Sequence, residues 1–384
     1  MSTGAPAATE ASSAAAPAPG ERFVAGDPLR ALAALSVFCF HVAIYSDHAS
    51  SGTSGSFGTL VQRILSGMNI GVWMFFVLSG FLLARPFARG VMGRAPMPAI
   101  KPFLRNRLRR LVPGLWALIA VTLVVQGVQQ GPWWKVPVAA AFGQVYVPGG
   151  FDEQLPHAWT LDAEMFFYVC LPAMFALVAA STRTAGVRRR AVIGLAVLAA
   201  IAIASLALRQ ALSDSVEHLR IAPALLFGFV PGIALAVLEP AIGARPGLLR
   251  RDLLWLILGL GLLTIVAGAL LSSDLVVLRS VAATVSSGLL VAAALGWQWS
   301  GRTTPAAIDN PVLQWLGQRS YSFYLFHLLV VQQVALGLAG SLDGRVLLLG
   351  TAALGLAASL AAAELGYRFV ERPFLRRREA WRNG

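Results

Sequence analysis

The sequence predicts an all-α protein, a polytopic bundle of about ten transmembrane helices. Hydrophobic residues make up 57% of the 384 residues and charged residues only 13%. A water-soluble domain of this composition would have more apolar surface than it could cover. Apolar segments of about 20 residues, the length that crosses a bilayer, recur along the chain. Between them, arginines gather in alternate loops, as in multi-pass membrane proteins.

Ten apolar segments are long enough to span a membrane. They cover residues 28–46, 67–84, 111–130, 159–180, 191–210, 221–238, 252–272, 275–296, 320–340 and 346–369. Asp27 and Pro28 are typical of the first positions of a helix and mark the start of the first segment. The basic segment 98–110 is expected to begin a helix that lies along the cytoplasmic membrane interface before turning into the third span. The predicted organisation is a disordered cytoplasmic tail (1–25), one transmembrane domain (26–375) and a basic cytoplasmic tail (376–384).

The formal net charge of +13 would suggest a nucleic-acid partner in a soluble protein. Here the positions of the charges favour a different interpretation. One set of alternate loops holds most of the arginines, including the cluster from Arg105 to Arg110 and the run from Arg188 to Arg190. Because basic loops stay in the cytoplasm, both termini are predicted to be cytoplasmic. We therefore expect a multi-pass protein of the inner (plasma) membrane, in contact with the lipid bilayer and not with nucleic acid.

Two ionisable residues share one face of the first predicted span. Arg30 and His41 are eleven residues apart, which corresponds to about 16 Å of helix rise and about three turns. Arg30 would lie near the cytoplasmic surface and His41 near the middle of the bilayer. Ionisable groups at such depth are costly and usually belong to a pathway or a site. The pair is therefore the first candidate for chemistry.

Other ionisable or polar residues fall in or beside the fourth and ninth segments. His157, at the predicted outer mouth of the fourth span, precedes Glu164 by seven residues, so the two are expected to share a face. Tyr168 would lie one turn deeper than Glu164. In the ninth segment, Tyr324 and His327 are also about one turn apart. These groups could converge in one polar cavity.

Each candidate also has a purely structural interpretation. A buried histidine such as His41 or His327 is often hydrogen-bonded inside a core, and Glu164 could pair with an arginine. Glu364, in the tenth segment, is a further ionisable residue of this kind. The arginine cluster from 105 to 110 is explained by topology alone, because every inner-membrane protein needs cytoplasmic arginines.

Six segments, taken in order, resemble the motifs of the integral-membrane acyltransferase family 3. They are Arg30 to His41 (Arg, ten residues, His), Gly71 to Leu83 (GVWMFFVLSGFLL), Phe103 to Pro113 (FLRNRLRRLVP), His157 to Glu164 (HAWTLDAE) with Phe167 and Tyr168, Ser320 to His327 (SYSFYLFH), and Glu371 to Phe374 (ERPF). The resemblance covers about residues 25–375. It implies a membrane enzyme that O-acylates a hydroxyl with acetyl- or another acyl-coenzyme A as donor and without a metal.

The resemblance also implies roles for single residues. Arg107 and Arg110 match the paired arginines of a cytoplasmic Arg-x-x-Arg element, and with Arg30 they are expected to bind the donor's phosphates or pantetheine, since guanidinium pairs with phosphate in two-point geometry. Catalysis is expected of His41, with Arg30 and Glu164. The candidates for substrate binding are His157, Trp159, Tyr168, Tyr324 and His327.

The chain departs from the family's pattern in two places. Many relatives carry a second Glu after the one matched by Glu164, and this chain has Met165, so the resemblance does not imply a mechanism with two carboxylates. Some relatives have a fused extracytoplasmic hydrolase-like domain, where this chain has a short basic tail. We therefore expect the bundle to complete the transfer or to pass the acyl group to a separate extracytoplasmic transferase.

Several functional alternatives remain open at this level. His41 could act as a general base on the acceptor hydroxyl or could itself be acylated. The first choice of acceptor is a cell-envelope carbohydrate, and the second is a secondary metabolite such as a macrolide antibiotic. A transporter or flippase for a lipid-linked sugar would also use buried ionisable residues, but it would usually show paired repeats or broken helices. A non-catalytic scaffold would have no need for Arg30 and His41 on one face.

Overall fold

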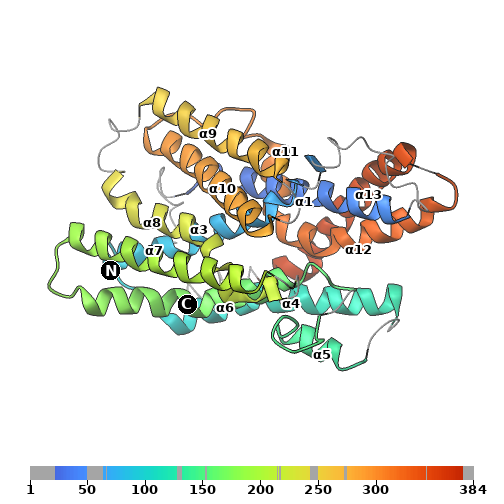
Figure 1. Ribbon diagram of the computed structural model, residues 1–384, viewed down its shortest axis with the longest axis horizontal. Helices are drawn as coiled ribbons and strands as arrows, with labels where there is room; N and C mark the ends of the chain where they lie inside the picture. Colours follow the sequence, from blue (N-terminus) through green and yellow to red (C-terminus); the bar gives the residue numbers. More distant parts are fainter. Residues whose placement is uncertain are drawn as a thin grey trace, which may run out of the picture.

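The computed structural model describes residues 22–49, 64–65, 67–127, 132–151, 154–213, 215, 218–242, 250–271, 275–342 and 344–374. Within these ranges the chain forms helices and no strand, which confirms the all-α prediction. The helices lie side by side in a bundle (Figure 1). They are α1 (Gly26–Ala49), α3 (Ile70–Val91), α4 (Ile100–Gln126), α5 (Lys135–Ala140), α6 (Trp159–Ser181), α7 (Val187–Ala211), η1 (His218–Arg220), η2 (Ala222–Gly228), α8 (Val230–Ile242), α9 (Arg251–Leu270), α10 (Val276–Trp299), α11 (Pro311–Gln318), α12 (Ser320–Ala339), α13 (Gly344–Gly366) and η4 (Tyr367–Glu371).

Nine helices in the described part of the chain are long and apolar enough to cross a membrane. The tenth predicted span, 221–238, is a bent pair in which η2 and α8 meet at 44°. Pro231 lies in the first turn of α8, where a helix tolerates the missing N–H, so the chain can restart there after the break. The prediction of about ten spans is confirmed, whereas the sidedness of the termini remains a prediction.

One local prediction is confirmed only in part. The basic segment 98–110 does begin a helix, but this helix, α4, starts at Ile100 and continues without a break to Gln126. Phe103 and Leu104 pack against the hydrophobic core, and the buried Leu111, about two turns later, belongs to it. Because the apolar face is continuous, the helix has no reason to break.

The residues that precede α1 are packed and only partly match the predicted tail. Phe23 is 7% exposed, and its ring lies 5.6 Å from that of Phe81 on α3. The backbone N–H of Val24 donates to Oε1 of Gln298 at 3.1 Å. The remainder of the tail predicted over 1–25, and the tail predicted over 376–384, lie outside the described residues.

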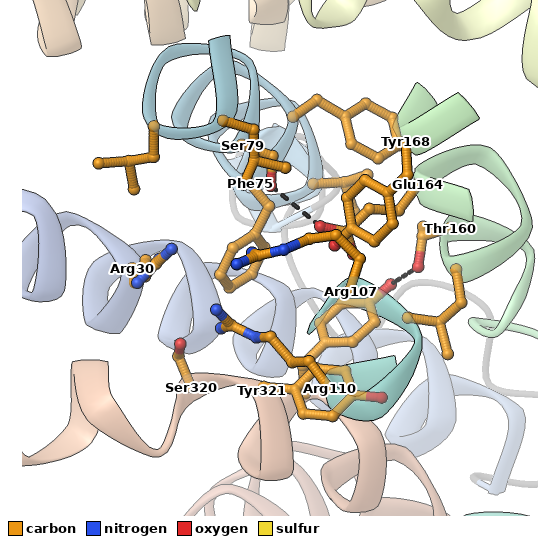
Figure 2. A pocket seen from close by; sticks show the side chains of 16 residues that line it. Arg30, Phe75, Ser79, Arg107, Arg110, Thr160, Glu164, Tyr168, Ser320 and Tyr321 are labelled. Carbon is orange, nitrogen blue, oxygen red and sulfur yellow. Dashed lines mark hydrogen bonds between the residues drawn. The ribbon is translucent and has the colours of Figure 1, made fainter. Parts of the chain in front are cut away.

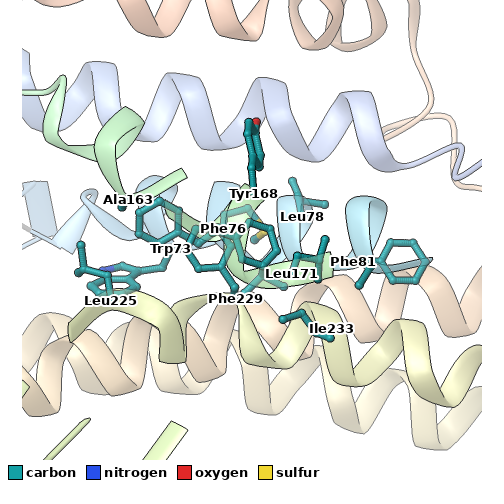
Figure 3. Packing of buried hydrophobic residues seen from close by; sticks show 14 of the residues in the cluster. Trp73, Phe76, Leu78, Phe81, Ala163, Tyr168, Leu171, Leu225, Phe229 and Ile233 are labelled. Carbon is teal, nitrogen blue, oxygen red and sulfur yellow. The ribbon is translucent and has the colours of Figure 1, made fainter. Parts of the chain in front are cut away.

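Aromatic side chains from α3, α6 and η2 form the centre of the core (Figure 3). Phe229, at the bend between η2 and α8, stacks between Phe76 and Phe167 at centroid distances of 4.5 and 4.1 Å. Trp73 lies 5.1 Å from Phe227. Such pairs add stabilisation beyond the buried area alone. The bend is thus held at the point where α3 and α6 pass the site described below.

Glycines allow the helices around α3 to approach closely. A Cβ on Gly232 of α8 would lie 1.9 Å from the carbonyl oxygen of Val77, and one on Gly71 of α3 would lie 2.2 Å from that of Ala33 on α1. Small residues at such contacts let transmembrane helices pack backbone to backbone. Gly71 thereby holds α3 against the helix that carries Arg30 and His41.

Gly232→Ala is expected to lower the apparent Tm of the purified protein, because the added methyl must push α8 away from α3, at a cost of about 1–3 kcal/mol. The matched control is Gly259→Ala in α9, where a Cβ meets nothing within 4 Å. The control should leave Tm unchanged or raise it slightly, since alanine favours a helix over glycine. Equal effects of the two substitutions on a thermal melt would contradict the close packing.

Candidate active site

A small basic cavity lies among α1, α3, α4, α6 and α12 (Figure 2). Its volume is about 70 Å³. The guanidinium groups of Arg30, Arg107 and Arg110 point toward the same space, the first from α1 and the other two from α4. Arg107 and Arg110 are three residues apart on one helix, so they share a face. The remaining polar side chains of the lining are Ser79, Thr160, Glu164, Tyr168, Ser320, Tyr321 and Tyr324.

Acidic groups lie near the arginines of this cavity. Ser79 donates a hydrogen bond of 3.1 Å to Oε1 of Glu164. Both Glu164 and Glu371 lie close enough for their charges to act on Arg110. Asp27 lies 3.5 Å from Arg30. The lining itself, among the described residues, contains three arginines and one carboxylate, Glu164, which suits an anionic ligand.

A second and larger cavity, about 560 Å³, lies beside the first. His41, Tyr45, His157 and Trp159 line it. Three arginines also line it, namely Arg209, Arg220 and Arg279. Val72 and Tyr324 line both cavities and therefore form the partition between them. The Tyr324 hydroxyl is fixed by hydrogen bonds to Oγ1 of Thr160 at 2.9 Å and to the carbonyl of His157 at 3.3 Å.

His41 and His327 form a directed hydrogen-bonded pair. Nδ1 of His41 lies 2.9 Å from Nε2 of His327. Nδ1 of His327 lies 2.7 Å from the carbonyl oxygen of Tyr324 and 3.2 Å from that of Phe323. A carbonyl can only accept, so this nitrogen must carry the hydrogen. In an uncharged ring Nε2 of His327 then accepts from Nδ1 of His41, and Nε2 of His41 keeps its lone pair.

His157 lies in the turn before α6 and approaches the same pair. Its ring centroid is 5.9 Å from that of His327, and its Nε2 lies 2.9 Å from the carbonyl oxygen of Leu325, to which it must donate. Burial lowers the pKa of His157 to about 4, because a charged imidazole loses its hydration there. His157 is therefore uncharged at neutral pH.

The structure divides the predicted site residues between the two cavities. Arg30, Arg107, Arg110, Glu164 and Tyr168 line the basic cavity, and His41, His157 and Trp159 line the larger one. Tyr324 belongs to both. His327, expected to bind substrate, is fully buried and is found in neither lining. It contacts His41 instead.

One sequence-based expectation about this region differs from the structure. His157 and Glu164 do not share a helix face, because α6 begins only at Trp159 and His157 precedes it. Glu364 lies in neither cavity lining and pairs with Arg319 and Arg368. The charges and spacings in the sequence do not show which of these ionisable residues line a cavity and which do not.

Sequence reasoning missed two ionisable residues that line the larger cavity. Arg209 and Arg279 both fall inside predicted spans, at 191–210 and 275–296, but near their ends. The criterion that singled out Arg30 and His41, an ionisable residue within an apolar segment, would have found them.

Among the described residues, no group of three or more His, Cys, Asp or Glu side chains is placed to hold a metal ion.

These features define a multi-pass membrane protein with two internal polar cavities and a histidine pair beside their partition. The chain belongs to acyltransferase family 3, since the family model described as an acyltransferase domain matches residues 26–364. The match confirms the resemblance found in the sequence motifs.

Similar proteins include the peptidoglycan O-acetyltransferase OatA of Listeria monocytogenes, which is 26% identical over 372 residues, 90% of this chain and 55% of that protein. The acyltransferase MdmB of Streptomyces mycarofaciens is 26% identical over 382 residues, 91% of this chain and 90% of that protein. The chain thus spans little more than half the length of the Listeria relative. No solved structure matches it.

Proposed function

We propose that this protein is a membrane O-acyltransferase that moves an acetyl or other short acyl group from acyl-coenzyme A to a hydroxyl of a cell-envelope carbohydrate. The observation that carries the proposal is the placement of His41. It lines a cavity of about 560 Å³ and is separated from the basic cavity by the partition of Val72 and Tyr324. The family match supports acyl transfer as the reaction class.

The basic cavity is the proposed donor side. Arg30 lies in the first turns of α1 and the paired arginines in the first half of α4, the ends that the charge distribution predicts to be cytoplasmic. Acyl-coenzyme A is made in the cytoplasm and carries several phosphates. Arg107 and Arg110 would hold a phosphate or the pantetheine arm, with Arg30 beside them. The thioester would then extend toward His41, about 16 Å deeper along α1.

His41 is the proposed catalytic base. As the acceptor oxygen attacks the thioester carbonyl, its proton passes to Nε2 of His41, whose lone pair is left free by the hydrogen bond from Nδ1 to His327. The C–S bond then breaks, and the coenzyme A thiolate takes the proton from the imidazolium. The products are an O-acyl ester and coenzyme A, and the imidazole returns to its starting form. In the alternative route the same lone pair attacks the thioester, and an acyl-histidine then transfers the group.

The acceptor is proposed to enter through the larger cavity. Trp159 lines it, and an aromatic face of this kind can stack on a sugar ring. The name of the Listeria relative, a peptidoglycan O-acetyltransferase, supports a glycan as acceptor and acetyl as the transferred group. The test is whether the purified protein consumes acetyl-coenzyme A faster when envelope glycan fragments are added, with the O-acetylated product detected by mass spectrometry. Donor consumption that no hydroxyl acceptor accelerates would contradict the proposal.

His327→Ala is expected to lower kcat by about 10- to 100-fold while leaving the KM of the donor nearly unchanged. His327 acts as a positioning residue, because it holds the His41 tautomer that exposes Nε2, and a wrong tautomer is costly in comparable sites. His327→Gln offers an amide oxygen to Nδ1–H of His41 and should recover part of the rate. The measurement is kcat and its pH profile in both variants. If alanine and glutamine variants both matched the wild-type kcat, the tautomer argument would fail.

A further inference from the structure

The larger cavity is lined by more positive charge than its proposed role as a carbohydrate site requires. Arg209 enters it from the end of α7, Arg220 from η1 and Arg279 from α10. Its lining contains no Asp or Glu among the residues that the structure describes. This side of the bundle is the one that the charge distribution predicts to be outside, where basic residues are depleted. Topology therefore does not explain these arginines.

Arg209 is held rigidly, and no carboxylate among the described residues neutralises its charge. Its side chain is 5% exposed, and its two terminal nitrogens donate to the carbonyl of Leu219 at 2.7 Å and to Oγ of Ser280 at 2.9 Å. The guanidinium carbon lies 5.5 Å from the ring centroid of Trp73 and 5.9 Å from that of Phe227. Nε is buried without a hydrogen-bond partner, and no carboxylate in the described part of the chain forms an ion pair with this side chain.

A buried cation without a counter-charge is unfavourable, and in membrane proteins it marks a site. Arg279 lines the same cavity as Arg209. It is the fourth residue of α10 and directly precedes Ser280, to which Arg209 donates a hydrogen bond. Arg220 is placed over the ring of Phe151 at 4.2 Å, so its charge is already in contact with an aromatic face. The two arginines of α7 and α10 are thus the pair best placed to bind an anion beside His41.

We propose that the larger cavity binds an anionic acceptor, whose carboxylate or phosphate is held by Arg209 and Arg279 while its hydroxyl faces His41. Arginine suits both groups because its planar fork pairs with two oxygens at once. The volume of about 560 Å³ is in the range of small-molecule sites. The reaction at His41 rests on the function proposed above, whereas anion binding can be tested without it.

The test is equilibrium binding to the purified full-length protein in phosphatidylcholine nanodiscs, followed as the shift of Tm with ligand concentration. The probes are methyl glucuronide for a carboxylate, glucose 1-phosphate for a phosphate, and methyl glucoside as the neutral analogue. We expect at least one charged probe to bind about tenfold or more tightly than the neutral one, the effect of one charge-assisted contact. Whichever charged probe binds more tightly identifies the anion.

Arg279→Gln and Arg209→Lys should each remove most of this preference. Arg209→Lys keeps the charge but loses the planar fork of the guanidinium. Arg279→Gln changes the more exposed of the two arginines, so the test does not depend on a position that folding needs. Arg345→Gln is the matched control, because Arg345 is exposed, lies at the start of α13 on the same predicted side and does not line the cavity. The control should bind the charged probe as the wild type does.

Equal binding of the charged and neutral probes, or no binding of either charged probe, would overturn the proposal. So would an unchanged preference in Arg279→Gln. The lipid alternative is tested in phosphatidylglycerol nanodiscs. If the Tm of the wild type rises only in that lipid, and the rise is lost in the two variants, the arginines bind a lipid headgroup. That result would also overturn the proposal. Acetyl-coenzyme A consumption is measured on the same samples. Charged-sugar binding without that consumption would support the cavity and count against acyl transfer.

Discussion

His41→Ala is expected to lower kcat by about 10²- to 10⁴-fold, the usual contribution of a positioned general base. The KM of the acyl donor should change little, because the proposed donor cavity does not include His41. The substitution leaves Nε2 of His327 without its partner, so a modest loss of stability is also expected. Initial rates of acetyl-coenzyme A consumption and a thermal melt of the same sample separate the two effects.

His218→Ala is the matched control for this experiment. His218 is exposed in η1 and lines neither of the two cavities, so its removal takes away an imidazole without touching the proposed chemistry. Wild-type kcat in the His41 variant would exclude His41 both as the base and as an acylated nucleophile. Mass spectrometry of the wild-type protein mixed with acetyl-coenzyme A alone distinguishes those two routes, since only the second leaves an acyl group on the protein.

The double substitution Arg107→Ala with Arg110→Ala is expected to raise the KM of the acyl donor by about 100-fold or more. Two charge-assisted hydrogen bonds are lost, and each is worth about 1.5–3 kcal/mol. In the wild type this KM should rise with ionic strength, and in the variant the salt dependence should be weaker, because screening acts only on charges that are present. The measurement is the donor KM at several salt concentrations.

The control for this pair is Arg105→Ala with Arg109→Ala. It removes the same number of charges from the same helix, but neither residue lines the basic cavity. If both double variants showed the wild-type KM, the arginines of α4 would serve only the orientation of the protein in the membrane. If both raised KM equally, the general charge of this surface, and not the cavity, would attract the donor.

The site could be predicted in part because some of its features are local. Arg30 and His41 occupy one helix, and the helical repeat alone places them on one face. The spacing of Arg107 and Arg110 works in the same way. The prediction that His157 and Glu164 share a helix face is wrong, because it assumes one helix through both residues. In the structure His157 lies in a turn, and α6 begins only at Trp159. Arg209 and Arg279 were overlooked because they lie near the ends of apolar segments, where arginine is common.

The sequence by itself determined the all-α class, the approximate spans and the family, because length of apolar runs, charge distribution and motif order can be read along the chain. Only the tertiary structure decided which helices meet. His41 and His327 are 286 residues apart in the sequence, and their hydrogen bond assigns the free nitrogen of His41. The division into two cavities likewise depends on how α1, α3, α4, α6 and α12 pack. Packing between membrane helices follows from close steric fit at small residues, which hydropathy does not register.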